Sequence, residues 1–260
     1  WIRQGLVDFV TIGIFFNGAV IPVAKFKSQL NEPSVPVYAS TENGGSSPRQ
    51  PFSHGIYRSM ASHILAQGGD GVYLFNYFIA EYYSTYQSKL FLKDGGLVCP
   101  VIMRELLHEL GSLETLRKRN KLYCMDDGCS AEWGYKPDTK LPLMLSPGNH
   151  DSVTLFIGDD TKRDVPEEAI LFLRSNHSAQ IELSVNGLKA ETQKPEYVHL
   201  FDRAQNLGKD EVVYAFIIPV SCLKQGDNQI SFLSLTNDPF TIKRVELALK
   251  YGDVKTHGYF

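Results

Sequence analysis

The stretch Gln180–Val185 reads Gln-Ile-Glu-Leu-Ser-Val, in which polar and apolar residues alternate without interruption. A period of two is typical of a β-strand with one face in the core and the other in water. The pair Asn186-Gly187 follows directly and is a strong turn signal. This segment therefore predicts antiparallel sheet structure in the second half of the chain.

Similar short runs lie on both sides of this stretch, and turn signals rich in Gly, Asn and Asp separate them. The further strand candidates are Val153–Ile157, Ala169–Leu173, Val212–Ile218, Gln229–Leu235 and Arg244–Tyr251. Short strands at such spacing favour an antiparallel β-sandwich of the jelly-roll-like kind. We assign this sandwich to residues 141–260.

Toward the N-terminus the pattern changes. Leu6–Phe16, Val35–Ala39 and Gly71–Phe78 are dense apolar runs, as expected of strands buried on both faces. Before the last of them, Ile56–Gln67 repeats apolar residues at helical spacing and ends at Gly68-Gly69. Strands and a helix that alternate over short connections predict a parallel sheet.

Polar helical stretches follow this α/β pattern. Ile102–Leu110 and Leu113–Arg119 are expected to be helices, with Ser112 as the N-cap of the second. The basic run Leu116–Lys121 is interpreted as a solvated helix terminus, where cations are favourable. We therefore expect an α/β segment with trailing helices over 1–122, a linker over 123–140, and the sandwich after it.

Composition narrows the classes of function. The net charge of -3 implies no basic face, which argues against nucleic acid as a partner. No apolar run reaches about 18 residues, so no membrane span is expected. The chain has no phosphate-binding Gly-rich loop and no His-Glu-x-x-His motif, and we expect neither a metal nor another cofactor. The cellular location stays open, and a secreted or periplasmic protein is compatible with the sequence.

The spacing of two cysteines leaves two interpretations open. Cys124 and Cys129 enclose the tight polar turn Met-Asp-Asp-Gly. They either form a disulfide or remain two free thiols.

Several of these pieces carry a family resemblance. They are Trp1-Ile2-Arg3-Gln4-Gly5-Leu6-Val7-Asp8, Val35-Pro36-Val37-Tyr38-Ala39 and Gly69-Asp70-Gly71-Val72-Tyr73-Leu74-Phe75-Asn76. They resemble the sixth, seventh and eighth strands, with their lead-ins, of a glycoside-hydrolase-like TIM barrel from bacterial polysaccharide-degrading proteins. The stretch Leu106–Leu116 is similar to the helical segment that leads out of such barrels, and the second half looks like the β-sandwich that often follows. The expected fold is thus a partial (β/α) barrel segment followed by an antiparallel β-sandwich.

The resemblance implies a retaining glycoside hydrolase that acts on a polysaccharide or glycan. Retaining enzymes use two carboxyl groups about 5 to 5.5 Å apart. The nucleophile position at the end of the seventh strand corresponds to Glu42, for which the alternative is a solvated loop carboxylate. Asn17, Asn76, Tyr77 and His54 are candidate sugar-binding residues, although His54 could equally cap the helix that follows it.

The acid/base position belongs to a fourth strand that this sequence does not contain. We therefore expect turnover to need the missing barrel half, and the alternative is a non-catalytic carbohydrate-binding or structural module. The strands at Leu6–Phe16 and Gly71–Phe78 would each lack a neighbour in an incomplete barrel. Because unpaired apolar edges favour pairing with other chains, we expect either a homo-oligomer or a bound barrel fragment, and the alternative is that the chain covers these edges with its own loops.

Overall fold

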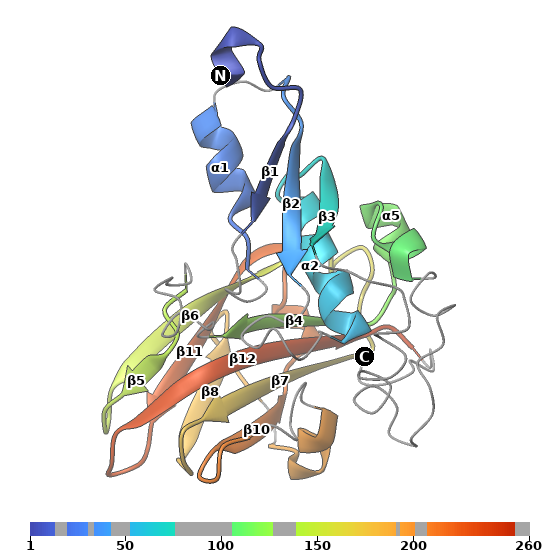
Figure 1. The fold of residues 1–260 in the computed structure, drawn as a ribbon. Coiled ribbons are helices and arrows are strands. Elements are labelled where there is room, and N and C mark those ends of the chain that lie inside the picture. Colours follow the sequence, from blue (N-terminus) through green and yellow to red (C-terminus); the bar gives the residue numbers. More distant parts are fainter. Residues whose placement is uncertain are drawn as a thin grey trace.

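The computed structural model describes residues 1–13, 20–30, 34–42, 53–75, 106–126, 139–190, 193–200 and 207–252. These residues form a small parallel α/β unit that stands on one sheet of a β-sandwich (Figure 1). Helix α2 lies between the two parts and packs on strand β4 of the sandwich.

The α/β unit contains η1 (Ile2–Gln4), β1 (Val10–Gly13), α1 (Val23–Leu30), β2 (Val37–Glu42), α2 (His54–Ala66) and β3 (Gly71–Phe75). Its three strands are parallel and lie in the order β1-β2-β3. The predicted alternation of strand and helix around a parallel sheet is confirmed. Within the described residues the sheet has three strands and does not close into a barrel.

The trailing helical segment is shorter than the sequence predicts. Residues 106–109 are helical, and α5 spans Leu113–Leu116. Ser112 is its N-cap as predicted, since the Ser112 hydroxyl accepts a hydrogen bond from the Thr115 amide at 3.1 Å. The helix does not reach Arg119, because Arg117 leaves the helical conformation with ψ 139° and Lys118 has a left-handed backbone with φ 52°.

The sandwich has two antiparallel sheets. The first sheet consists of β10 (Val212–Ile217), β7 (Glu168–Ser175), β12 (Phe240–Lys250) and β4 (Lys121–Asp126), with β5 (Leu143–Leu145) also paired to β12. The second sheet consists of β6 (His150–Ile157), β11 (Gly226–Ser234), β8 (Ile181–Val185) and β9 (Leu188–Lys189). Two short 3-10 helices, η3 (Pro195–Leu200) and η5 (Val220–Cys222), lie in the connections. All six strands predicted from the sequence are present.

Strand β4 differs from the predicted layout, in which the linker begins at residue 123. It pairs with β12 along its length, so that Cys124 lies opposite Glu246. The sequence did not predict β4 as a strand, because a charged residue lies at each of its ends. Both charges are neutralised by buried partners, Lys121 by Asp159 at 2.8 Å and Asp126 by Arg244 at 2.7 Å.

The first sheet is buried on both of its faces. On the inner face, Leu171 and Val245 join the core that it shares with the second sheet. On the outer face, Phe172 packs in a separate core with Ile56 and Met60 of α2. Double burial explains why Ala169–Leu173 is continuously apolar, whereas Gln180–Val185 in the second sheet alternates.

Among the described residues, helices cover one face of the parallel sheet. Val23 of α1 and Ile64 of α2 pack with the fully buried Ala39 of β2. The neighbouring residue Tyr38 is only half-buried, and Tyr73 of β3 is 48% exposed. None of the helices in the described ranges has the length and apolar character needed to span a bilayer.

Candidate functional site

The carboxyl edge of the parallel sheet is the first candidate site. Glu42 is the last residue of the middle strand β2 and pairs with Phe75, the last residue of β3. The sequence predicted a strand ending at Ala39 with Glu42 in the loop beyond it, whereas the strand continues to Glu42. Because the three strands are parallel, their carboxyl ends meet at the same edge.

The predicted sugar-binding residues belong to the segments that leave this edge. His54 is the half-buried first residue of α2, directly after the N-cap Ser53, whose hydroxyl accepts from the Ile56 amide at 3.4 Å. Asn17, Asn76, Tyr77 and the Glu42 side chain lie outside the described residues. Their roles therefore stay predictions.

Polar contacts fix α2 on the sandwich and so position the segment that begins at His54. The Ser59 hydroxyl donates to the Leu122 carbonyl at 2.7 Å. The Tyr123 hydroxyl lies 3.1 Å from that of Ser62. At Gly158 the sandwich comes so close to α2 that a Cβ atom would lie 2.4 Å from the Ser62 carbonyl oxygen.

His63 of α2 is a structural histidine. Its Nε2 lies 3.0 Å from the Ile21 carbonyl, and its ring meets Phe156 edge-on at 5.0 Å between centroids. Burial lowers the pKa of His63 from 6.5 to about 4. The ring is therefore neutral at pH 7, and it connects the segment before α1 with α2 and the sandwich.

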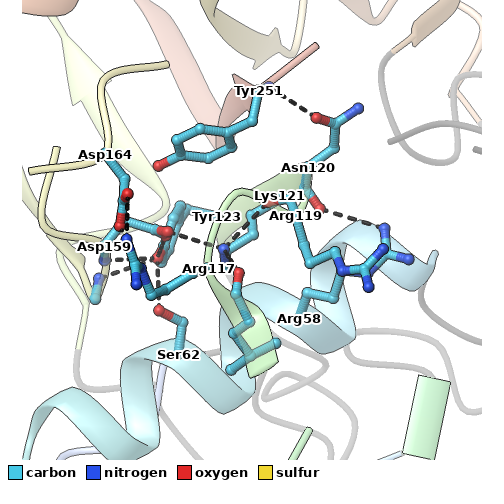
Figure 2. Close-up of polar contacts among 12 residues, drawn as sticks. Arg58, Ser62, Arg117, Arg119, Asn120, Lys121, Tyr123, Asp159, Asp164 and Tyr251 are labelled. Carbon is cyan, nitrogen blue, oxygen red and sulfur yellow. Dashed lines mark hydrogen bonds and ion pairs between the residues drawn. The ribbon is translucent and has the colours of Figure 1, made fainter. Parts of the chain in front are cut away.

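A buried polar cluster lies where the α/β unit meets the sandwich (Figure 2). The Lys121 ammonium donates to Asp159 Oδ1 at 2.8 Å and to the carbonyls of Leu116 and Arg119 at 2.6 and 3.1 Å. It also lies 5.4 Å from the centroid of the Tyr251 ring. Burial lowers the pKa of Lys121, and the Asp159 charge opposes that shift.

Tyr123 completes this cluster from the inner face of β4. Its hydroxyl donates to Asp159 Oδ2 and accepts from the Gly158 amide at 3.0 Å. Burial raises the pKa of Tyr123, and the nearby Asp159 carboxylate adds to the shift. Sequence reasoning missed this cluster, because Lys121 looked like the end of an exposed basic run. The several hydrogen bonds that Lys121 and Tyr123 each make indicate a structural role.

Two other expectations can be placed only in part. Cys124 is buried in β4, and Cys129 lies outside the described residues, so the disulfide stays a prediction. Within the described ranges no group of three or more His, Cys, Asp or Glu side chains could hold a metal ion.

Comparison with known proteins finds similar solved structures. No family model matches the chain, and no curated protein matches it. One similar structure is BuGH86 in complex with neoagarooctaose, with 19% identity over 50% of this chain and 19% of that chain, at a TM-score of 0.29. Another is BpGH86A, a beta-porphyranase of glycoside hydrolase family 86 from the human gut bacterium Bacteroides plebeius, with 15% identity over 42% of this chain and 19% of that chain, also at 0.29. The alignments thus span about a fifth of each neighbour, and similarity at this level assigns neither activity nor substrate.

Proposed function

We propose that this chain belongs to a glycoside-hydrolase-like protein that acts on a polysaccharide or glycan, with the sandwich as an accessory domain. The observation that carries the proposal is the position of Glu42 at the carboxyl end of the middle strand of a parallel sheet. Barrel enzymes draw their catalytic residues from the carboxyl ends of their strands.

The sheet itself supports its assignment to a larger (β/α) barrel. All-parallel sheets are normally covered on both faces, and the helices in the described part of the chain cover one of them. The opposite face carries Tyr38 and Tyr73, and in a barrel that face becomes the packed interior. The Tyr38 ring lies against Gly71, where a Cβ atom would come within 2.7 Å of the ring. A bulky side chain that packs against a glycine of the neighbouring strand is compatible with the packed interior of a barrel.

Glu42 is assigned as the nucleophile of a retaining reaction. A second carboxyl group about 5 to 5.5 Å away is required as the acid/base, and it would come from a strand that this sequence does not contain. Hydrolysis therefore needs additional polypeptide that completes the barrel. Asn17, His54, Asn76 and Tyr77 are assigned to glycan binding around Glu42.

The test uses the variant Glu42→Gln in the assembled protein with its barrel completed. Loss of a nucleophile removes a covalent step rather than ground-state contacts, so turnover of the polysaccharide should fall by at least about 10³-fold while binding changes little. Asp8→Asn is the matched control, since Asp8 precedes β1 at the opposite edge of the sheet. Near-full activity in Glu42→Gln would remove the nucleophile assignment. Glycan binding without any turnover in the unmodified assembly would instead identify a non-catalytic module.

A further inference from the structure

A charged depression of about 680 Å³ lies on the trailing helical segment, on the surface beside the buried cluster of Figure 2. Its lining residues come from residues 106–110, from α5 and from the loop after α5. They are His108, Glu109, Glu114, Thr115, Arg117, Lys118 and Arg119. The basic run of the sequence thus forms one part of a cavity wall.

Most charges around this depression are already paired. Arg58 of α2 donates to Glu109 at 2.5 Å. Arg117 binds Asp164 and Glu114, each at 2.8 Å. By contrast, Arg119 lies 3.6 Å from Glu109 with 45% of its side chain exposed. Among the described residues, the Lys118 ammonium makes no ion pair or hydrogen bond.

The local charge is positive although the whole chain is negative. At this corner three carboxylates pair with four cationic side chains, and Lys118 is a fifth cation. They are Glu109, Glu114 and Asp164 against Arg58, Arg117, Lys118, Arg119 and Arg163. The net charge of the chain is -3. The excess of cations here is therefore a local feature, and an anion could balance it.

Hydrogen bonds from buried residues fix the loop that carries Lys118. Buried Lys121 donates to the carbonyls of Leu116 and Arg119, on either side of Lys118. Next along the chain, the Asn120 side-chain oxygen accepts from the Tyr251 amide at 2.8 Å. Figure 2 shows these contacts converging from several elements. A loop fixed in this way presents its exposed cations without a large ordering cost on binding.

The helix-terminus interpretation of the basic run does not account for Lys118. The carbonyl of Leu116, which ends α5, already accepts from Lys121 and from the Arg119 amide at 3.3 Å. In addition, Lys118 is held at φ 52°, a conformation that costs energy for a residue with a Cβ atom and that is frequent at ligand-binding sites.

We propose that this depression binds an oxyanion group of a ligand, with Lys118 and Arg119 as the charged donors and His108 as a further lining residue. Sulfate or phosphate esters and carboxylates share the required chemistry, which is a compact negative group with several acceptor oxygens. The proposal is independent of Glu42 and of the glycoside hydrolase assignment.

The test titrates the chain with sodium sulfate, inorganic phosphate and acetate at constant ionic strength and follows heat release and amide chemical shifts. Saturable binding of at least one anion is expected, with shifts at residues 116–120. Sulfate or phosphate binding without acetate binding would point to a tetrahedral ester, and acetate binding of equal strength to a carboxylate. Lys118→Gln should weaken binding about tenfold or more, because it removes a charged donor.

Lys118→Gly serves as a second variant, since glycine accepts the positive φ and keeps the loop geometry. It should also weaken binding. Lys162→Gln is the matched control, an exposed lysine on the loop that follows β6. Equal weakening by Lys162→Gln would reduce the effect to general charge and overturn the site. Absence of saturation with all three anions would overturn it as well.

Discussion

The Lys121 ammonium and the Asp159 carboxylate lie 2.8 Å apart, with side-chain exposures of only 0% and 7%. Lys121 begins β4, and Asp159 follows β6, so the pair joins one sheet of the sandwich to the other. Lys121 also holds the loop after α5 through two carbonyls. A single buried cation thus connects the sandwich with the trailing helical segment.

Removal of one member of this pair should be strongly destabilising. Asp159→Asn leaves the Lys121 charge buried without its counterion, and we expect the free energy of unfolding to fall by about 3–5 kcal/mol. Urea denaturation followed by circular dichroism measures the change. The exposed pair Lys189–Glu182, at 2.6 Å, is the control, and Glu182→Gln should cost less than about 1 kcal/mol. Similar small losses in both variants would contradict the structural role of the buried pair.

Stability should also fall in mild acid because of His63. The unfolded chain takes up a proton on this histidine near pH 6.5, whereas the folded chain does so only near pH 4. The unfolded state therefore binds more protons in this window. The stability that His63 contributes to the folded state is complete above pH 6.5 and is lost as the pH falls toward 4. The full effect is at most about 3 kcal/mol. Unfolding free energies at pH 7, 6 and 5 measure the slope.

The variant His63→Gln should flatten this slope, and His150→Gln, which changes an exposed histidine of β6, should leave it unchanged. The measurements stop at pH 5 to keep Glu211 out of the comparison. Burial raises the pKa of Glu211, but its partners Lys243 and Arg174 lower it to about 2. Its titration therefore changes the free energy of unfolding only at lower pH. An unchanged slope in His63→Gln would show that other groups cause the acid sensitivity.

Gly158→Ala tests the close approach of α2 to the sandwich. The added Cβ atom would lie 2.4 Å from the Ser62 carbonyl oxygen, so the helix has to move. Overpacking of this kind costs about 1–3 kcal/mol. Gly111→Ala is the matched control, since a Cβ atom at Gly111 meets nothing within 4 Å. Equal melting temperatures for the two variants would mean that the interface yields freely.

The face of the parallel sheet that none of the described helices covers should cause association. Phe9 and Tyr73 are 57% and 48% exposed, and β1 and β3 are the edges of the sheet within the described residues. We expect a mass above the monomer by light scattering at high concentration, or a co-purifying fragment. The variant Tyr73→Lys should reduce this association. The variant Met144→Lys, which changes an exposed apolar residue of the sandwich, should not. A strictly monomeric species without a fragment would contradict this expectation.

The strands with regular periodicity could be predicted from the sequence, and the others could not. Gln180–Val185 alternates because one face of the second sheet meets water, and its turn signals are local. Strand β4 escaped prediction because Lys121 and Asp126 look like surface residues until their buried partners are known. Those partners are distant in the sequence, and a local pattern carries no trace of them.

The same limit applies to the sites. The place of Glu42 followed from a strand pattern and a rule about strand ends, although β2 proved longer than its apolar run. The depression around Lys118 depends instead on which neighbouring charges are already paired. Arg117 and Lys118 are adjacent in the sequence and equally basic, yet only the first has carboxylate partners. Which charged side chains are paired can be known only from the three-dimensional structure.

The double burial of the first sheet bears on how this protein could have evolved. An accessory domain joined by a flexible tether can be gained, lost or exchanged between enzymes as a separate cassette. Here Phe172 of the sandwich and Met60 of α2 belong to one hydrophobic core. Excision of the sandwich would expose the helix, and excision of the helix would expose the sheet. The two parts are therefore expected to be inherited together and to melt in a single cooperative transition.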